Sequence, residues 1–272
     1  MMRSLWSAAS GMTNQQLNVD TIANNIANVN TVGYKKERLE FKTLLYETMQ
    51  RADLDAANQT GRPVNLQVGH GVRAVVTSRM FTPGNLESTS NDLDFAIEGD
   101  GFFVVQRGED DIVYSRDGSL KAAIVEDGLM ITTSDGYPVL STEGEPIILD
   151  AEILMSDVTV NEEGEFFHRD AENQYVPLDF QFELVQFSNR QGLEAVGGNF
   201  YQTTPASGEA LSESQGDTVR RSRIRQKFLE MSNVSVADEM VNLIVAQRAY
   251  ELNSRVITTS DEMLQQANTL KR

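Results

Sequence analysis

Few side chains in this 272-residue sequence have the chemistry of a catalytic or metal-binding site. It contains no cysteine, which excludes disulfides, thiolate zinc sites, iron–sulfur clusters and cysteine nucleophiles. With only two histidines, a multi-histidine metal site is nearly excluded, and a Ser-His-Asp triad would have to use one of them. His70, between Gly69 and Gly71, is predicted to be a loop residue, and His168, beside acidic residues, is predicted to be exposed. We therefore expect no catalytic residue, no metal, no cofactor and no enzymatic activity.

Acidic residues offer more candidates but no recognisable site. Asp92 with Asp94, and the run 109–111, could suggest a calcium loop, but the EF-hand spacing with its glycine and terminal glutamate is absent. Both are predicted to be solvated acidic turns. Gly99-Asp100-Gly101 lacks the lysine and following helix of a phosphate-binding loop and is predicted to be a β-turn. Composition leaves glycosidase-like acid–base chemistry open, although no carboxylate pair is singled out by its context.

The formal net charge of −17 is concentrated in the middle of the chain. Residues 1–85 carry 9 basic and 6 acidic side chains, residues 86–217 carry 5 and 28, and residues 218–272 carry 9 and 6. The acidic centre would repel a polyanion, so we expect no nucleic-acid partner, and we expect no small-molecule substrate. The basic run 220–227 could bind an anionic surface, or meet the acidic centre of the same or a neighbouring subunit.

The first thirty residues show the seven-residue periodicity of a helix with an apolar stripe. The other faces carry Ser, Thr, Asn and Gln, which suit close, hydrogen-bonded packing against neighbours. We predict that residues 28–33 end this helix, with Gly33 taking a positive φ at the C-cap. One seven-residue series is Leu5, Met12, Val19 and Ile26, and the other is Ala8, Gln15, Ile22 and Val29.

The last forty residues repeat this pattern, and no Gly or Pro follows residue 216. At about 1.5 Å per residue, such a helix would be roughly 50 Å long. Two terminal helices cannot bury their stripes alone, so they should pair with each other or with neighbouring subunits; the alternative is an ordinary intramolecular core. The first series is Val236, Leu243, Tyr250, Ile257 and Leu264, and the adjacent one is Ala249, Val256, Met263 and Leu270. The candidate assembly interface comprises Leu5, Met12, Val19, Ile22, Ile26, Val29, Val236, Leu243, Tyr250, Ile257 and Leu264.

The middle of the chain changes to the pattern of an antiparallel β domain. Asp-Gly and Glu-Gly pairs recur there, most of them 8 to 10 residues apart, and the stretches between them carry strand formers. The predicted fold class is α+β, with long N- and C-terminal helices packed as a coiled coil and flanking a central antiparallel β domain. The expected parts are an N-terminal assembly helix at 1–34, an extended connecting segment at 35–85 with a strand at 72–81, an acidic β domain at 86–217 whose end from 202 onward is a loop or linker, and a return strand with the C-terminal assembly helix at 218–272.

Three stretches of the sequence resemble the bacterial flagellar basal-body rod and hook family. The first is IANNIANVNTVGYKK at residues 22–36. The second is LDFAIEGDGFF at 93–103, followed by YSRDGSL at 114–120, and the third is LEMSNVSVADEMV at 229–241, followed by QRAYELNS at 247–254. Within the family the chain is most similar to distal rod members, because it has Arg3-Ser4-Leu5-Trp6, is much shorter than a typical hook protein, and carries a similar insertion between Leu44 and Gly69.

The resemblance implies a structural subunit of the distal rod, which assembles into a rigid helical tube that transmits torque from the motor to the hook. It implies a homopolymer whose further partners are proximal rod proteins, the hook protein, rod-surrounding ring proteins and the flagellar export apparatus. The expected place is the periplasmic basal body, reached without a cleaved signal peptide; no run is apolar enough to span a bilayer. The alternatives are a proximal rod or hook-type axial subunit, and a surface-binding β domain on helical stalks.

Two local features remain. The connecting segment has residues that could fill gaps between subunits and stiffen a rod: Tyr46, Met49, Leu54, Pro63 and Leu66. The alternative for this segment is a flexible linker, given its polar centre. The sequence also departs from the family at Lys227, where relatives commonly have glycine.

Overall fold

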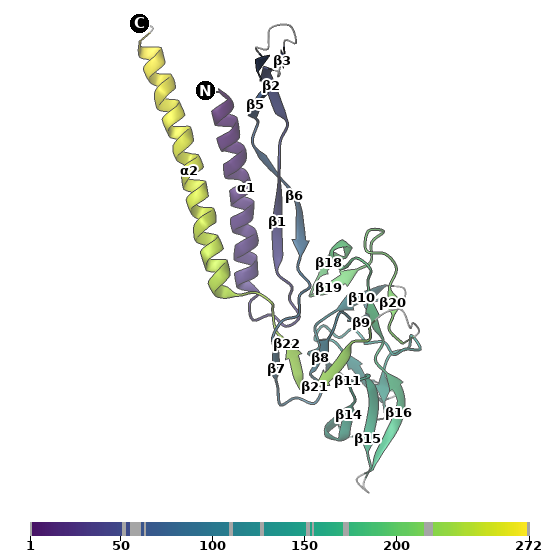
Figure 1. The fold of residues 1–272 in the computed structure, drawn as a ribbon. Coiled ribbons are helices and arrows are strands. Elements are labelled where there is room, and N and C mark those ends of the chain that lie inside the picture. The colour runs from purple at the N-terminus through teal and green to yellow at the C-terminus, as the bar shows by residue number, and fades with distance from the viewer. Residues whose placement is uncertain are drawn as a thin grey trace. The chain divides into compact units, whose positions relative to one another are not determined.

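The computed structural model describes residues 2–50, 53–54, 61–62, 64–108, 111–125, 128–150, 153, 155–170, 174–214 and 220–270. The chain divides into two compact units (Figure 1). The first, here called the helical unit, contains Met1–Ala27, Glu37–Ser78 and Ser235–Arg272. The second, here called the β unit, contains Asn28–Lys36 and Arg79–Val234. The class is α+β, as predicted, with one helix from each end of the chain and a β-rich centre.

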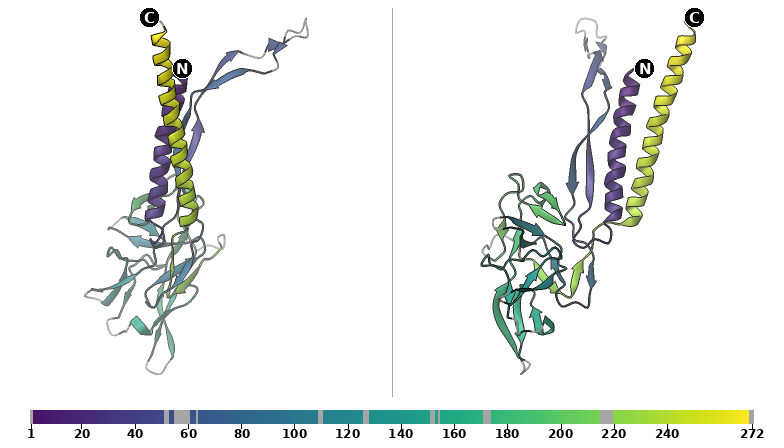
Figure 2. Two further views of the ribbon diagram at one scale, coloured as in Figure 1. Left: turned by 90° about the vertical axis from the view of Figure 1, so that its left-hand side faces the viewer. Right: turned by 180° about the vertical axis from the view of Figure 1, so that it is seen from behind.

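The helical unit is built on two helices that lie side by side and run in opposite directions (Figures 1 and 2). They are α1 (Met2–Ala27) and α2 (Val236–Thr269), the two regions in which seven-residue periodicity predicted helices. The N-cap of α2 is Ser235, whose side chain accepts a hydrogen bond from the backbone N–H of Asp238. Acidic Asp238 and Glu239 in the first turn also suit the positive end of the helix dipole. Neither described helix is long and apolar enough to cross a membrane.

Extended chain completes the helical unit. It forms β1 (Glu37–Thr43) beside β6 (Val72–Arg79), then β2 (Tyr46–Gln50) antiparallel to β5 (Leu66–Gly69), and the short pair β3 (Asp53–Leu54) and β4 (Gly61–Arg62). Two asparagines of α1 attach the first pair of strands. Asn14 donates to Val72 O at 2.9 Å and accepts from Ala74 N, and Asn25 donates to Glu37 O at 2.8 Å and accepts from Glu37 N at 2.9 Å. Each amide thus binds backbone groups of the two-stranded ribbon and fixes it to the helix.

The first helix ends earlier than its periodicity predicted. It stops at Ala27, so Val29 lies in the turn that follows and belongs to the β unit, not to the helical stripe. Gly33 has the predicted positive φ of 68°, but it lies six residues beyond the helix and is not its C-cap. Its N–H donates to Glu230 O at 2.8 Å, and a Cβ there would come within 2.8 Å of the Arg116 carbonyl carbon. Close backbone contact is therefore what requires glycine.

The β unit contains one six-stranded sheet and several smaller ones, and every strand pair given for its described residues is antiparallel. The large sheet has the order β18 (Glu194–Gly197), β19 (Phe200–Gln202), β10 (Ile112–Ser115), β9 (Phe102–Gln106), β17 (Leu184–Gln186) and β20 (Leu211–Ser212). The three-stranded sheets are β11 (Lys121–Val125), β12 (Gly128–Thr132) and β13 (Ile148–Leu149), and β14 (Val158–Val160), β15 (Glu165–Arg169) and β16 (Tyr175–Gln181). Two further pairs join β8 (Phe95–Glu98) to β21 (Arg223–Gln226) and β7 (Leu86–Ser88) to β22 (Phe228–Glu230).

Aromatic side chains fill the two faces of the large sheet. Because neighbouring residues of a strand point to opposite faces, Phe102 and Phe103 enter different clusters. Phe103 packs edge-on against Phe182 with ring centroids 5.5 Å apart, and Phe102 packs against Tyr201 at 5.9 Å. The predicted Asp-Gly and Glu-Gly turns are present where Gly136, Gly144 and Gly164 take positive φ. These buried rings give the β unit a hydrophobic core of its own.

The structure shows how Lys227 is accommodated at a position where relatives commonly have glycine. It lies between β21 and β22 with a φ of 66°, a left-handed conformation in which glycine avoids the steric cost of a Cβ. Its Nζ forms an ion pair with Asp92 at 2.7 Å, and its N–H donates to Asp94 O at 2.7 Å. The lysine keeps the chain geometry that a glycine would adopt and adds a partly exposed ion pair.

Candidate assembly site

The contact between the two helices is made by small and polar side chains, spaced by seven residues. Ser4 Oγ lies 3.5 Å from Ser260 Oγ, and Asn25 donates to Glu239 Oε2 at 3.1 Å. Between these pairs, a Cβ added to Gly11 would lie 2.8 Å from Asn253 Nδ2. Each step of seven residues up α1 matches a step of seven down α2, as an antiparallel pair requires. The α2 side of this contact, here called the polar column, is Glu239, Ala246, Asn253 and Ser260.

The polar column was not predicted, because apolar periodicity does not mark a contact made by small and polar residues. The signal that could have found it is the same seven-residue spacing applied to small and polar residues, which allow close approach and fix register by hydrogen bonds. Glu239 is buried against Asn25 and also accepts from Asn242 at 3.3 Å, so its carboxylate is hydrogen-bonded rather than isolated. A buried, satisfied polar contact specifies the pairing but removes little apolar surface from water.

The predicted interface residues differ in how far they are buried within one copy of the chain. Leu5, Met12, Val19 and Ile26 of α1 and Leu243 and Ile257 of α2 are half-buried, and Ile22 is buried. Val236, Tyr250 and Leu264 are exposed, and Val29 is half-buried in the turn after α1. The adjacent α2 series is largely exposed, at Val256, Met263 and Leu270, with only Ala249 half-buried. Helix pairing within one chain therefore uses only part of the apolar surface of these helices.

Part of the apolar surface that remains exposed forms a stripe along α2, here called the outer stripe. Its members are Val241, Val245, Leu252, Val256 and Met263, which are between 45% and 62% exposed. At about 100° per residue, these five positions lie within roughly 60° of one another around the helix axis, and about 100° from the polar column. An exposed apolar stripe of this length is a mark of an interaction surface.

The hairpin of the helical unit exposes further apolar side chains. Tyr46, Met49 and Leu66, predicted to stiffen an assembly, are all exposed on the β2–β5 pair. Leu54 lies in β3, and its side chain, like the whole of Pro63, lies outside the described residues. Arg3 of α1 forms an ion pair with Glu47 of β2 at 2.6 Å, which ties the base of this hairpin to the helix.

The β unit has a buried ion cluster that sequence reasoning missed. Lys35 Nζ lies 2.6 Å from Glu230 Oε1, and Arg116 Nη1 lies 3.3 Å from Glu230 Oε2, with all three side chains essentially inaccessible to solvent. Lys35 also donates to Thr82 O at 3.0 Å, and Arg116 to Gly99 O at 2.7 Å. The cluster joins the segment after α1 to the strand that leads back to α2, because Lys35 and Glu230 stand on those two segments.

Burial and the neighbouring Arg116 lower the pKa of Lys35 to about 8, against the attraction of Glu230. The ordinary pKa of lysine is 10.5, so the native state releases this proton at a lower pH than the unfolded chain does. Between about pH 8 and 10.5 the unfolded state binds more protons at this residue, so its contribution to the free energy of unfolding increases with pH, by up to roughly 1.4 kcal/mol per pH unit.

Lys35→Arg should remove that increase, because arginine stays protonated in both states. The measurement is urea unfolding followed by circular dichroism. The free energy of unfolding of the original chain, minus that of Lys35→Arg, should increase as the pH rises from 8 to 10.5. A difference that is constant over this range would contradict the assignment.

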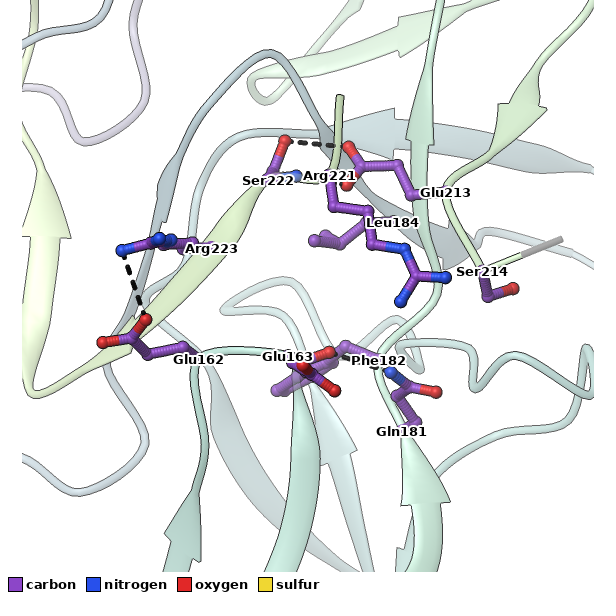
Figure 3. Close-up of a pocket in the computed structure, with 10 residues that line it drawn as sticks. All are labelled: Glu162, Glu163, Gln181, Phe182, Leu184, Glu213, Ser214, Arg221, Ser222 and Arg223. Atoms are coloured by element: carbon purple, nitrogen blue, oxygen red, sulfur yellow. Dashed lines mark hydrogen bonds and ion pairs between the residues drawn. The ribbon is translucent and has the colours of Figure 1, made fainter. Parts of the chain in front are cut away.

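The basic run is held largely by acidic residues of the same chain. Arg223 pairs with Glu162 at 3.4 Å, and Arg225 with Glu98 at 2.8 Å. A polar hollow of about 320 Å³ lies beside this strand, and in it Glu213 accepts a hydrogen bond from Ser222 Oγ at 2.8 Å (Figure 3). These contacts fix the return strand against the acidic centre of the same chain. This agrees with the expectation that the basic run meets the acidic centre, and not an anionic surface.

The two histidines belong to different units, His70 to the helical unit and His168 to the β unit. His70 lies in the predicted loop, 3.7 Å from Glu47, and is exposed. His168 was predicted to be exposed, but it is half-buried on β15, the middle strand of the sheet between β14 and β16. Within the described ranges, no group of three or more His, Asp or Glu side chains could hold a metal ion.

Comparison with known proteins agrees with the three stretches of sequence. Residues 5–35 match the family model described as flagella basal body rod protein, residues 96–168 match the flagellar hook protein FlgE/F/G D1 domain, and residues 225–270 match the flagellar basal body rod FlgEFG protein C-terminal model. The chain is 47% identical to the flagellar basal-body rod protein FlgG of Borreliella burgdorferi, over 100% of both chains. It is 40% identical to that of Agrobacterium fabrum, over 96% of this chain and 97% of the relative, and 38% identical to that of Bacillus subtilis, over 100% of both.

Proposed function

Because this chain belongs to the flagellar basal-body rod protein family, we propose that it builds the distal part of the rod as a self-assembling subunit. Many copies would form a rigid helical tube that transmits torque from the motor to the hook. The support for the distal position is the full-length similarity to relatives named FlgG, and the alternative is a proximal rod or hook-type subunit. The names of the same relatives support the proposal of a structural role without catalysis.

One observation carries the proposal of self-assembly. The helices meet through the polar column, while the outer stripe of α2 remains exposed to water. A chain that worked as a monomer would gain stability by burying that stripe in the helix pair. We propose instead that neighbouring copies cover it, in a coiled-coil-like packing that also includes those predicted interface residues of the two helices that are exposed or half-buried in one copy, such as Leu5, Val236 and Leu264.

The surroundings of the subunit are proposed on the same premise. Proximal rod proteins and the hook protein would lie at the two ends of the tube, ring proteins would surround it, and the export apparatus would deliver the chain to the periplasm without cleavage of a signal peptide. The proposed parts are the N-terminal assembly segment at 1–34, whose helix ends at Ala27, the connecting segment at 35–85, the acidic β domain at 86–217 and the return strand with the second helix at 218–272. A surface-binding β domain on helical stalks is disfavoured by the exposed stripe, which a simple stalk would not need.

The proposed rigidity can be tested on the hairpin. We expect the purified chain to polymerise into straight rods in electron micrographs, and a chain lacking residues 47–64 to form rods that are curved or have a shorter persistence length. The reason is that the deletion removes exposed Met49 and most of β2, which pairs with β5, so the apolar wedge that Tyr46, Met49 and Leu66 would form between subunits is lost. Failure of the full chain to polymerise would contradict the proposed function, whereas equally straight rods from both chains would assign stiffness to another part.

A further inference from the structure

The helical unit has a shallow groove on another side of α1 from the polar column. It has a volume of about 460 Å³ and is lined by α1 and by the first pair of strands. The groove-lining residues of α1 run from Leu17 to Asn24, and at about 100° per residue they lie roughly 60° to 160° around the helix from the heptad position that faces α2 at Gly11 and Asn25. Its lining residues are Leu17, Asp20, Thr21, Asn24, Glu37, Leu39, Ala74, Val75, Val76 and Thr77.

The chemistry of the groove is apolar with acidic edges. Leu17, Val75 and Val76 each leave between 43% and 50% of their surface exposed. The charged residues that line it are Asp20 and Glu37, and no basic residue lines it. Within the described residues, no ion pair is formed by Asp20, which is exposed. A matching ligand is therefore an apolar surface with a cation beside it.

The outer stripe of α2 has this chemistry. Two arginines, Arg248 and Arg255, lie one heptad apart along its edge, within about 60° of the stripe's first residue, Val241. Arg248 pairs with Glu251 at 3.0 Å in an exposed pair, which contributes little stability and can exchange partners. In the part of the chain that the structure describes, Arg255 forms no ion pair.

We propose that the groove of one copy receives the outer stripe of α2 from a second copy, with Arg255 beside Asp20. This inference rests on the proposed self-assembly and names the two surfaces that meet. Groove and stripe are different surfaces of one unit, so the contact is heterologous: each copy that fills a groove offers its own groove to the next. Such a contact, unless its rotation closes a ring, extends into an open helical filament.

The test is a charge exchange in the full chain. Asp20→Arg and Arg255→Glu should each raise the critical concentration for polymerisation by about tenfold, because each places like charges together. The double variant Asp20→Arg/Arg255→Glu restores an opposite pair and should return to within about threefold of the original value. An equimolar mixture of the two single variants should also polymerise, because alternating copies then meet only through opposite charges. The matched control is Glu143→Arg, the same kind of charge reversal at an exposed turn of the β unit.

The outcomes separate this inference from the proposed function. Single variants that polymerise like the original chain would overturn the pairing of groove and stripe. So would a double variant that keeps the original circular dichroism spectrum but does not recover polymerisation. Neither result would affect the proposed function, which fails only if the original chain does not polymerise.

Discussion

Replacing Leu252 by aspartate is expected to abolish polymerisation while leaving both units folded. Leu252 is 61% exposed in the middle of the outer stripe, so the carboxylate stays hydrated in the monomer, and the cost there is only the lower helix propensity of aspartate. In the assembly the same carboxylate would be buried without a partner, which costs several kcal/mol. The critical concentration should therefore rise by at least about a hundredfold, as measured by sedimentation of the assembled material.

Leu252→Met is the matched control, because it keeps an apolar side chain of similar volume and should polymerise like the original chain. Leu252 is a sharper position than Ile26, which is half-buried within the subunit, where aspartate would also weaken the helix pair. Normal polymerisation of a folded Leu252→Asp chain would show that the outer stripe stays in water in the rod.

Glu230→Ala is expected to produce the largest loss of stability in the β unit. The substitution leaves Lys35 and Arg116 buried without their carboxylate, and breaking a buried ion pair by removing one partner costs about 3–5 kcal/mol. For a unit of this size, that corresponds to a fall of roughly 10 °C in the melting temperature, measured by scanning calorimetry.

Glu98→Ala provides the comparison, because Glu98 forms a half-exposed pair with Arg225 on the same unit. Removing an exposed pair should cost less than about 1 kcal/mol. If the two variants melted within a degree of each other, the buried cluster would not be a principal stabilising contact. Adding Lys35→Met to Glu230→Ala should recover part of the loss, because one buried cation is then absent.

The helices were predictable because periodicity is local information. A stripe that recurs every seven residues needs only the spacing of residues such as Leu5, Met12 and Val19, and it predicted α1 and α2 correctly. It did not show which face of α2 would meet α1. Asn253 and Ser260 carry no apolar signal, and their place in the contact depends on Gly11 and Ser4 of the other helix.

The ion cluster was not predictable for a related reason. Lys35 and Glu230 are 195 residues apart, and Arg116 and Glu230 are 114 apart, so no local pattern marks them as partners. Lys35 and Glu230 lie inside two of the three stretches that carry the resemblance, yet nothing in those stretches distinguishes a buried charge from an exposed one. A distant contact also explains why α1 ends earlier than predicted. The chain must turn after Ala27 for Gly33 to reach Glu230.

Protection of the outer stripe in the assembled rod tests the account most directly. The chain has no cysteine, so Leu252→Cys introduces a single thiol whose reaction with a maleimide can be timed in monomers and in rods. We predict rapid labelling in the monomer and labelling slowed by at least about tenfold in the rod, because a neighbouring copy covers the position. Glu143→Cys, at an exposed turn of the β unit, reports whether the reagent still reacts with an accessible thiol in rods. Equal labelling rates of Leu252→Cys in monomers and rods would contradict the claim that the outer stripe is the assembly surface.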